Sequence, residues 1–442
     1  MLHELSALRY PCCWLLVLTG LAVVAEFSDG NAIADEKSDQ SIEARNEVER
    51  LMKLVKSDDL QMRADAIVEL GKLGGKASLA AKLLVENLSD TKNKVTVERV
   101  TTSTANFASS ALTSIGEPAG PAVLEGLSHK NDDVRQKAAS ILGSIKYEAA
   151  INILIELLGD ENRTIAGAAS SALKRIGAPS SDRLLKILID GMKIPAPAKE
   201  WKDGEHPDTH DPLTLPRQQR NYAAGVLGQL DDPRAIEPLL KAFELDDRLF
   251  RRWAGSALSR LKSEECRSVI SRKDVVLRLL ELLQTDDRGQ RNDIMRVLQN
   301  VSREGRDPIL AALENPDRRV SVSVFQVWRR FYDDDRIVPI AVRRISADED
   351  DHDALLDPLA IQERWMAINA LSGKYLRDLD SREPVLTLLL DHLNDPSGQV
   401  RAAAAQRLAD LPYDWRSDPR ILPGLLNALK TRQDVSTRSS VI

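Results

Sequence analysis

An arginine-led pattern recurs along most of this chain. The arginine is followed by Ala at the third position, by Leu at the seventh and by an aliphatic residue at the tenth. Complete copies begin at Arg63, Arg135 and Arg401. Offsets of 3, 7 and 10 fall on one stripe of an α-helix. A helix of one design that is used many times predicts a solenoid, in which each unit packs only against its neighbours.

Aligning the copies on the arginine position divides the chain into units of two helices each. The anchors are positions 63, 105, 135, 166, 220, 251, 291, 321, 364, 401 and 438. Ala105, Ala166 and Ser321 stand where the other units have Arg. The first helix of each unit is Ala-rich, begins near Asp or Asn and is expected to end at Gly, as at Gly116, Gly143 and Gly177. The second helix is richer in Leu. These patterns predict an all-α fold.

The units resemble HEAT repeats, in the short variety shared with phycobilin lyases (PBS lyases). Residues 133–143 and 399–408 carry the resemblance best. It implies a right-handed α-solenoid of about ten helical pairs and a concave face formed by the second helices. These helices are expected at 77–88, 149–158, 234–243, 275–283, 384–393 and 421–429. A surface of this kind typically binds a protein or peptide.

The same resemblance implies a hydrogen-bonded ladder of Asp and Arg between neighbouring repeats. Carried over to this sequence, it pairs capping aspartates with the anchor arginines. The residues concerned are Asp59 with Arg63, Asp133 with Arg135 and Asp287 with Arg291, together with Arg220, Arg251, Arg364 and Arg401. The ladder is interrupted where the anchor is Ala105, Ala166 or Ser321.

The chain divides into five segments by composition. Residues 1–34 resemble a secretory signal peptide and 35–56 a capping helix. Residues 57–190 hold four repeats, 191–218 form a Pro-rich inserted loop, and 219–442 hold repeats 5–10 plus an incomplete final repeat. The β-branched stretch 95–100 is interpreted as an inter-repeat loop or helix start. The incomplete repeat indicates a frayed end, a docked end or a fragment of a longer protein.

The N-terminus predicts export to the periplasm or the medium. An uncharged apolar run covers 14–25, and Ala32-Ile33-Ala34 fits the rule of small residues at a cleavage site. The alternative is an uncleaved anchor. Cleavage after Ala34 leaves Cys266 as the one cysteine, so no intramolecular disulfide is then possible.

Charge argues against general nucleic-acid binding, because the chain beyond residue 34 carries 60 Arg and Lys against 64 Asp and Glu. The segment 248–344 is an exception, with 21 Arg and Lys against 14 Asp and Glu. Its arginine pairs Arg329-Arg330 and Arg343-Arg344 are therefore candidate partner-binding residues. The alternative is that these arginines are solvated and balanced by acidic loops.

The inserted loop contains the best candidate for a metal site. His206, His210 and Asp211 are ligand types for a divalent cation, although Pro207 disfavours the helix that would align the two histidines. The alternative is a solvated loop. Trp201 in the same loop is a candidate anchor for a partner, with packing inside the loop as the alternative. The acidic stretch 348–353 lacks the Gly of a Ca²⁺ loop and is interpreted as an inter-repeat loop.

No catalytic set is evident in the sequence. The His-Glu pairs that hold iron in HEAT-like hydroxylases are represented only by His3-Glu4 in the leader. Glu264 and Glu265 should disfavour a thiolate at Cys266. We therefore expect a non-catalytic exported scaffold for a protein or peptide, without a cofactor. Two alternatives remain: a metal- or ligand-binding sensor or enzyme module that uses the 191–218 loop, and a spacer segment of a larger exported enzyme.

Overall fold

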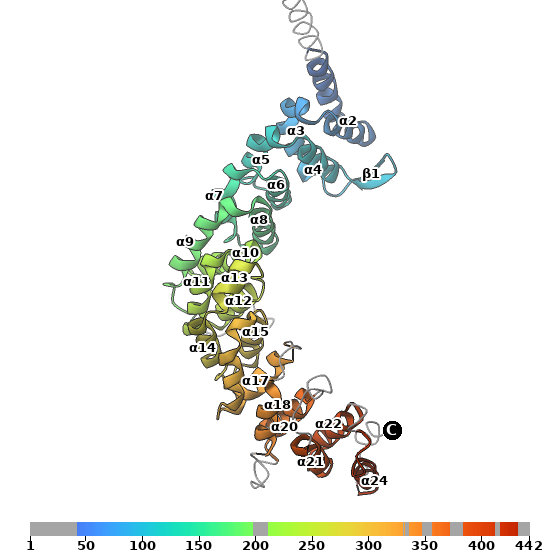
Figure 1. Cartoon of the computed structure of the whole chain (residues 1–442). Helices are drawn as coiled ribbons and strands as arrows, with labels where there is room; N and C mark the ends of the chain where they lie inside the picture. Colours follow the sequence, from blue (N-terminus) through green and yellow to red (C-terminus); the bar gives the residue numbers. More distant parts are fainter. Residues whose placement is uncertain are drawn as a thin grey trace, which may run out of the picture. The chain divides into compact units, whose positions relative to one another are not determined.

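The computed structural model describes residues 42–197, 211–329, 331, 336–346, 356–371, 383–411 and 416–431. The chain forms two compact units, Met1–Ile176 and Gly177–Ile442. In both units the described residues fold almost entirely into short helices that alternate between two stacked series (Figure 1). The predicted all-α solenoid is confirmed. No helix in the described part of the chain combines the length and apolarity needed to span a bilayer.

The first unit stacks its first helices in chain order after a helix over residues 42–55. These are α2 (Leu60–Lys72), α4 (Thr104–Ile115), α6 (Asp132–Ser144) and α8 (Arg163–Ile176), and each contacts the next. Each second helix begins in a 3₁₀ turn and continues as a short α-helix. The pairs are η1 (Gly74–Ala80) and α3 (Ala81–Glu86), η3 (Glu117–Ala119) and α5 (Gly120–Gly126), and η4 (Glu148–Ala150) and α7 (Ile151–Leu157). A further 3₁₀ turn, η2 (Asn87–Ser89), ends the first of them.

The stretch 95–100 forms a β-hairpin, so its interpretation as a loop or helix start is wrong. Strand β1 (Lys94–Val97) pairs antiparallel with β2 (Val100–Ser103). Val95 and Val97 alternate with exposed residues and are buried, and β1 packs against α2. Glu98 and Arg99 form the two-residue turn with φ angles of 49° and 72°. A hairpin forms instead of a loop or helix because the alternating burial against α2 suits β-branched side chains. The turn lacks the Asn-Gly sequence that usually marks a two-residue hairpin turn.

The second unit continues the two series. Its first helices are α10 (Thr214–Leu230), α12 (Arg248–Leu258), α15 (Arg288–Leu298), α17 (Arg318–Trp328), α20 (Pro358–Ala370) and α22 (Gly398–Ala409). Its second helices are α9 (Ser181–Gly191), α11 (Ile236–Lys241), α14 (Lys273–Glu281), α16 (Asp307–Ala311), α18 (Ile337–Ser346), α21 (Glu383–Asp391) and α24 (Ile421–Thr431). The additional helix α13 (Glu264–Ile270) precedes α14. In Figure 1, α9, α11 and α14 follow one side of this unit, and α10, α12, α15 and α17 follow the other.

The repeated stripe forms the core. The Ala and Leu positions of the three complete copies, at 66 and 70, 138 and 142, and 404 and 408, are all buried. Side chains of Asp59, Asp247 and Asp287 accept hydrogen bonds from N–H groups in the first turns of α2, α12 and α15, as their sequence position predicts.

Glycine has two different roles at the predicted helix ends. Gly116 and Gly177 follow α4 and α8 with φ angles of 78° and 88°, so these helices end at Gly as expected. Gly143 instead lies inside α6. A Cβ atom at this position would stand 2.5 Å from the Cα of Ala172 in α8. Gly143 therefore permits two first helices to approach closely rather than ending one of them.

Candidate functional site

The anchor arginines connect successive repeats. In the first unit, the Arg63 guanidinium donates to the carbonyl of Ser57 in the loop before its own helix, at 2.8 Å, and lies 3.5 Å from the carboxylate of Asp90, before α4. Arg135 repeats the arrangement with the His129 carbonyl at 2.9 Å and with Asp160 at 3.6 Å, before α8. Each arginine thus ties its own loop to the loop of the following repeat.

In the second unit two of these contacts are almost fully buried. Arg220 Nη2 lies 2.5 Å from Asp247 Oδ2, and the two side chains are 1% and 5% exposed. The Arg220 guanidinium also lies over the Phe250 ring, 3.9 Å from its centroid. Burial lowers the pKa of Arg220, while the hydrogen bond with Asp247 opposes that shift. Arg364 Nε binds Asp395 Oδ2 at 3.0 Å in the same way.

The carboxylate partner therefore differs from the one the family resemblance implied. Oδ1 of Asp59 and Oδ1 of Asp287 accept from N–H groups of their own helices, and Asp287 Oδ2 lies 3.3 Å from Arg248 Nε of the preceding repeat rather than beside Arg291. Asp133 accepts a hydrogen bond from Thr91 of the preceding repeat. The remaining anchors Arg251, Arg291 and Arg401 donate to the carbonyls of Leu245, Thr285 and Asp395, each six residues earlier.

In the repeat anchored on Ser321, an arginine from another helix takes the place of the missing anchor arginine. Glu363 of α20 is buried, and its carboxylate accepts from the Ser321 hydroxyl. Arg344 of α18 binds the same carboxylate, with Nε at 3.0 Å from Oε1. The link between repeats is thus preserved at Ser321. It also removes Arg344 from the candidate partner-binding residues, because its charge is committed to a buried carboxylate.

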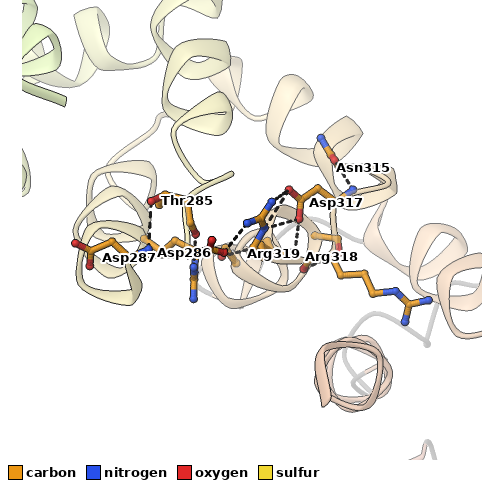
Figure 2. Close-up of polar contacts among 10 residues, drawn as sticks. Thr285, Asp286, Asp287, Asn315, Asp317, Arg318 and Arg319 are labelled. Carbon is orange, nitrogen blue, oxygen red and sulfur yellow. Dashed lines mark hydrogen bonds and ion pairs between the residues drawn. The ribbon is translucent and has the colours of Figure 1, made fainter. Parts of the chain in front are cut away.

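Other arginines of the 248–344 segment are also committed within the fold. Arg343 Nη2 lies 2.7 Å from Glu314, and Arg278 bridges Glu237 and Glu244. Figure 2 shows Arg319 between Asp286, before α15, and Asp317, before α17, at 2.6 and 2.8 Å.

This pairing does not support a basic docking surface over 248–344. Several of the neutralising acids, such as Glu237, Glu244 and Glu363, lie outside the segment, so a count of charges within it overstates its free charge. Of the remaining candidates, Arg329 is exposed at the end of α17, and Arg330 lies outside the described residues.

The metal hypothesis receives no support from the described part of the inserted loop. Asp211 Oδ2 lies 2.5 Å from Arg217 Nη1, and Asp211 also accepts from the Leu213 N–H. These hydrogen bonds lower the pKa of Asp211 and occupy its oxygens. Trp201, His206 and His210 lie outside the described residues. Among the residues that are described, no three His, Cys, Asp or Glu side chains gather as a metal site would require.

Cys266 is not placed to act as a nucleophile. Its side chain is fully buried at the start of α13, with Sγ 3.5 Å from the Asp231 carbonyl. Burial raises the pKa of the thiol to about 11. A neutral, inaccessible thiol is a packing residue rather than a reactive one.

A groove lies between two second helices of the second unit. It lies between α14 and α16 and holds about 600 Å³. Leu277, Leu280, Pro308, Ala311 and Ala312 form its apolar surface, and its polar lining is Ser271, Lys273, Glu281, Gln284, Glu304, Asp307 and Asn315.

Leu277 is the residue that sequence reasoning missed within the predicted second helix. Val276, Leu279 and Leu283 follow the buried stripe of this helix, whereas Leu277 falls off that stripe and is 44% exposed. The sequence did contain a signal for this exposed residue, because Leu277 is a large aliphatic residue that falls off the core stripe of its helix.

The fold and its inter-repeat contacts define the class of this protein as an α-solenoid of paired helices. A family model for HEAT repeats matches residues 120–194, and one for PBS lyase HEAT-like repeats matches residues 219–244. The chain therefore contains HEAT repeats over these residues, as the sequence pattern predicted.

Comparisons with other known proteins add little beyond this. No curated protein sequence matches the chain. One similar solved structure is the karyopherin Kap121p bound to the extreme C-terminus of the protein phosphatase Cdc14p. The two chains are 14% identical, and the TM-score is 0.44. The similarity covers 98% of this chain and 53% of Kap121p. Importin beta is similar at 12% identity, with 89% and 56% covered and a TM-score of 0.46. The chain spans about half the length of these proteins.

Proposed function

We propose that this protein is a non-catalytic exported scaffold that binds a protein or peptide partner on the second helices of its second unit. The supporting observation is the α14/α16 groove, in which Leu277 is exposed beside an apolar surface. An exposed apolar surface with polar residues around it is typical of a site where a partner buries an anchor side chain. The fold alone does not specify this function.

The form of the groove favours a macromolecular partner over a metabolite. It is an open surface channel formed by two neighbouring helices and lined by apolar and polar residues of both. Small-molecule sites usually enclose most of the ligand and present a few convergent polar groups. An open groove buries only one face of what it binds, which suits a side chain carried by a larger partner.

Changing Leu277 to Arg is expected to weaken capture of the partner strongly. The variant places a charge on the apolar lining of the groove without disturbing the repeat core, because Leu277 is partly exposed and off the buried stripe. The measurement is affinity capture from the native exported fraction, with partners identified and quantified by mass spectrometry. We expect at least about a tenfold loss of the stoichiometric partner.

Leu249 provides the matched control. It has a similar exposure of 48% but belongs to α12, a first helix. Leu249→Arg should capture the partner as the unchanged protein does. Equal capture by the Leu277 and Leu249 variants would exclude the α14/α16 groove as the binding surface.

Export rests on the leader over 1–34, which lies outside the described residues. N-terminal sequencing of the protein from its native host is expected to begin at Asp35, because Ala32 and Ala34 satisfy the small-residue requirement of the peptidase. Recovery of the chain with its residues 1–34 intact would reject cleavage and favour the anchor.

A further inference from the structure

Ion pairs join most of the consecutive second helices of the second unit. We use seam for the contact line between two such helices. The bridging pairs are Arg234–Asp182 at 2.7 Å for α9/α11, Arg278–Glu237 at 3.0 Å for α11/α14, Arg343–Glu314 and Arg336–Asp307 at 2.7 Å for α16/α18, and Arg420–Glu383 at 2.5 Å for α21/α24. A long arginine side chain that spans a seam covers the apolar surface beneath it.

Two seams lack such a bridge. Between described residues, no ion pair crosses the α14/α16 seam or the α18/α21 seam. A groove lies at each of these seams: the one of about 600 Å³ at α14/α16, and a second of about 350 Å³ at α18/α21. The second is lined by Val342, Ser346, Glu383, Pro384, Thr387, Leu388 and Asp391. The bridged α16/α18 seam separates the two grooves.

Both grooves carry more acid than base. The first has Glu281 and Glu304 against Lys273, with Asp307 set aside because it pairs with Arg336. The second has Asp391 and no cation among its lining residues, with Glu383 set aside because it pairs with Arg420. Glu281 and Asp391 are the last residues of α14 and α21, where the partial negative charge of a helix C-terminus adds to that of the carboxylate. A cationic side chain is favoured at the same end of each groove.

We infer that the partner presents an extended segment with two aliphatic side chains, one for each groove, and that Lys or Arg residues beside them meet Glu281 and Asp391. The grooves are two helix spacings apart, which is about 16–20 Å for packed helices. An extended chain advances about 3.3 Å per residue. The two aliphatic residues are therefore five or six positions apart. This inference rests on the proposed function and specifies the chemistry of its partner.

The test is a selection of random twelve-residue peptides displayed on phage, with the full chain as target. The expected enriched peptides carry net positive charge and two aliphatic residues five or six positions apart. A synthetic, fluorescently labelled copy of the leading peptide is then titrated by fluorescence anisotropy. Combined Glu281→Lys and Asp391→Lys changes are expected to weaken it at least about tenfold, because like charges then face each other across the interface.

Asp246→Lys is the charge-matched control, since Asp246 is 98% exposed and lies before a first helix. It should alter the affinity less than about twofold. Shortening the peptide spacing by three residues should weaken binding at least about tenfold, because one groove is then left empty. Enrichment of acidic peptides, no enrichment, or an affinity unaffected by the double variant would overturn the inference.

Failure of this inference is distinguishable from failure of the proposed function. If Leu277→Arg removes the native partner while the selected peptides are not basic, the scaffold function stands and the two-groove inference is wrong. If Leu277→Arg leaves the native partner bound, the proposed function itself fails.

Discussion

Replacing Arg220 with Met is expected to destabilise the α10–α12 region by about 3–5 kcal/mol. Met retains an apolar stem to pack against Gly191 and the Phe250 ring, but it leaves the Asp247 carboxylate buried without a counter-charge. Because repeats in a solenoid stabilise mainly their neighbours, the loss should be local. Native-state hydrogen exchange of the α10 and α12 amides is the measurement, with an expected loss of protection of about two to four orders of magnitude.

A second variant separates lost charge pairing from lost packing. Asp247→Asn keeps the cap on α12, where Asp247 Oδ1 accepts from the Phe250 N–H at 2.9 Å, and removes the unpaired charge. The combined variant Arg220→Met with Asp247→Asn should recover most of the lost protection. Arg343→Met, which breaks the exposed pair with Glu314, should cost about 1 kcal/mol or less. Equal losses for Arg220→Met and Arg343→Met would contradict this account of the buried pair.

Two Gly→Ala changes in the first unit are expected to change its stability in opposite directions. A Cβ at Gly143 would lie 2.5 Å from the Cα of Ala172, so α6 and α8 must separate, at a cost of about 1–3 kcal/mol. A Cβ at Gly167 would meet no atom within 4 Å. Gly167 lies inside α8, so Ala there should stabilise the unit by about 1 kcal/mol through helix propensity.

Urea denaturation monitored by circular dichroism measures both changes. Compared with the unchanged protein, the first unit should unfold at a lower urea concentration in the Gly143→Ala variant and at a higher one in the Gly167→Ala variant. A stabilising effect at both positions would show that the first helices tolerate a wider separation than the structure implies.

The sequence predicted the features that depend on local periodicity. The stripe of Ala66 and Leu70, repeated at Ala138 and Leu142, is sufficient to predict a helix with one buried face, and its recurrence predicts the stack. Capping by Asp287 follows from the same local logic, since a carboxylate before a first turn has free N–H groups within reach.

Features that depend on a neighbouring repeat could not be predicted in this way. The partner of Arg220 lies 27 residues away, and the residue that replaces an anchor arginine beside Ser321 comes from α18. The groove at Leu277 depends on how two successive second helices pack, and the pair of Arg278 with Glu237 joins repeats 41 residues apart in sequence. The resemblance to HEAT repeats specified that a ladder exists but not which carboxylate each arginine would meet.

Photo-crosslinking at position 277 tests the central claim most directly. A benzoylphenylalanine residue is introduced at Leu277, and separately at Leu249, in the protein expressed in its native host, and the cells are irradiated. The scaffold account predicts one discrete cross-linked partner from position 277 and none from position 249. The same products from both positions, or none from position 277 while the partner is still captured, would contradict it.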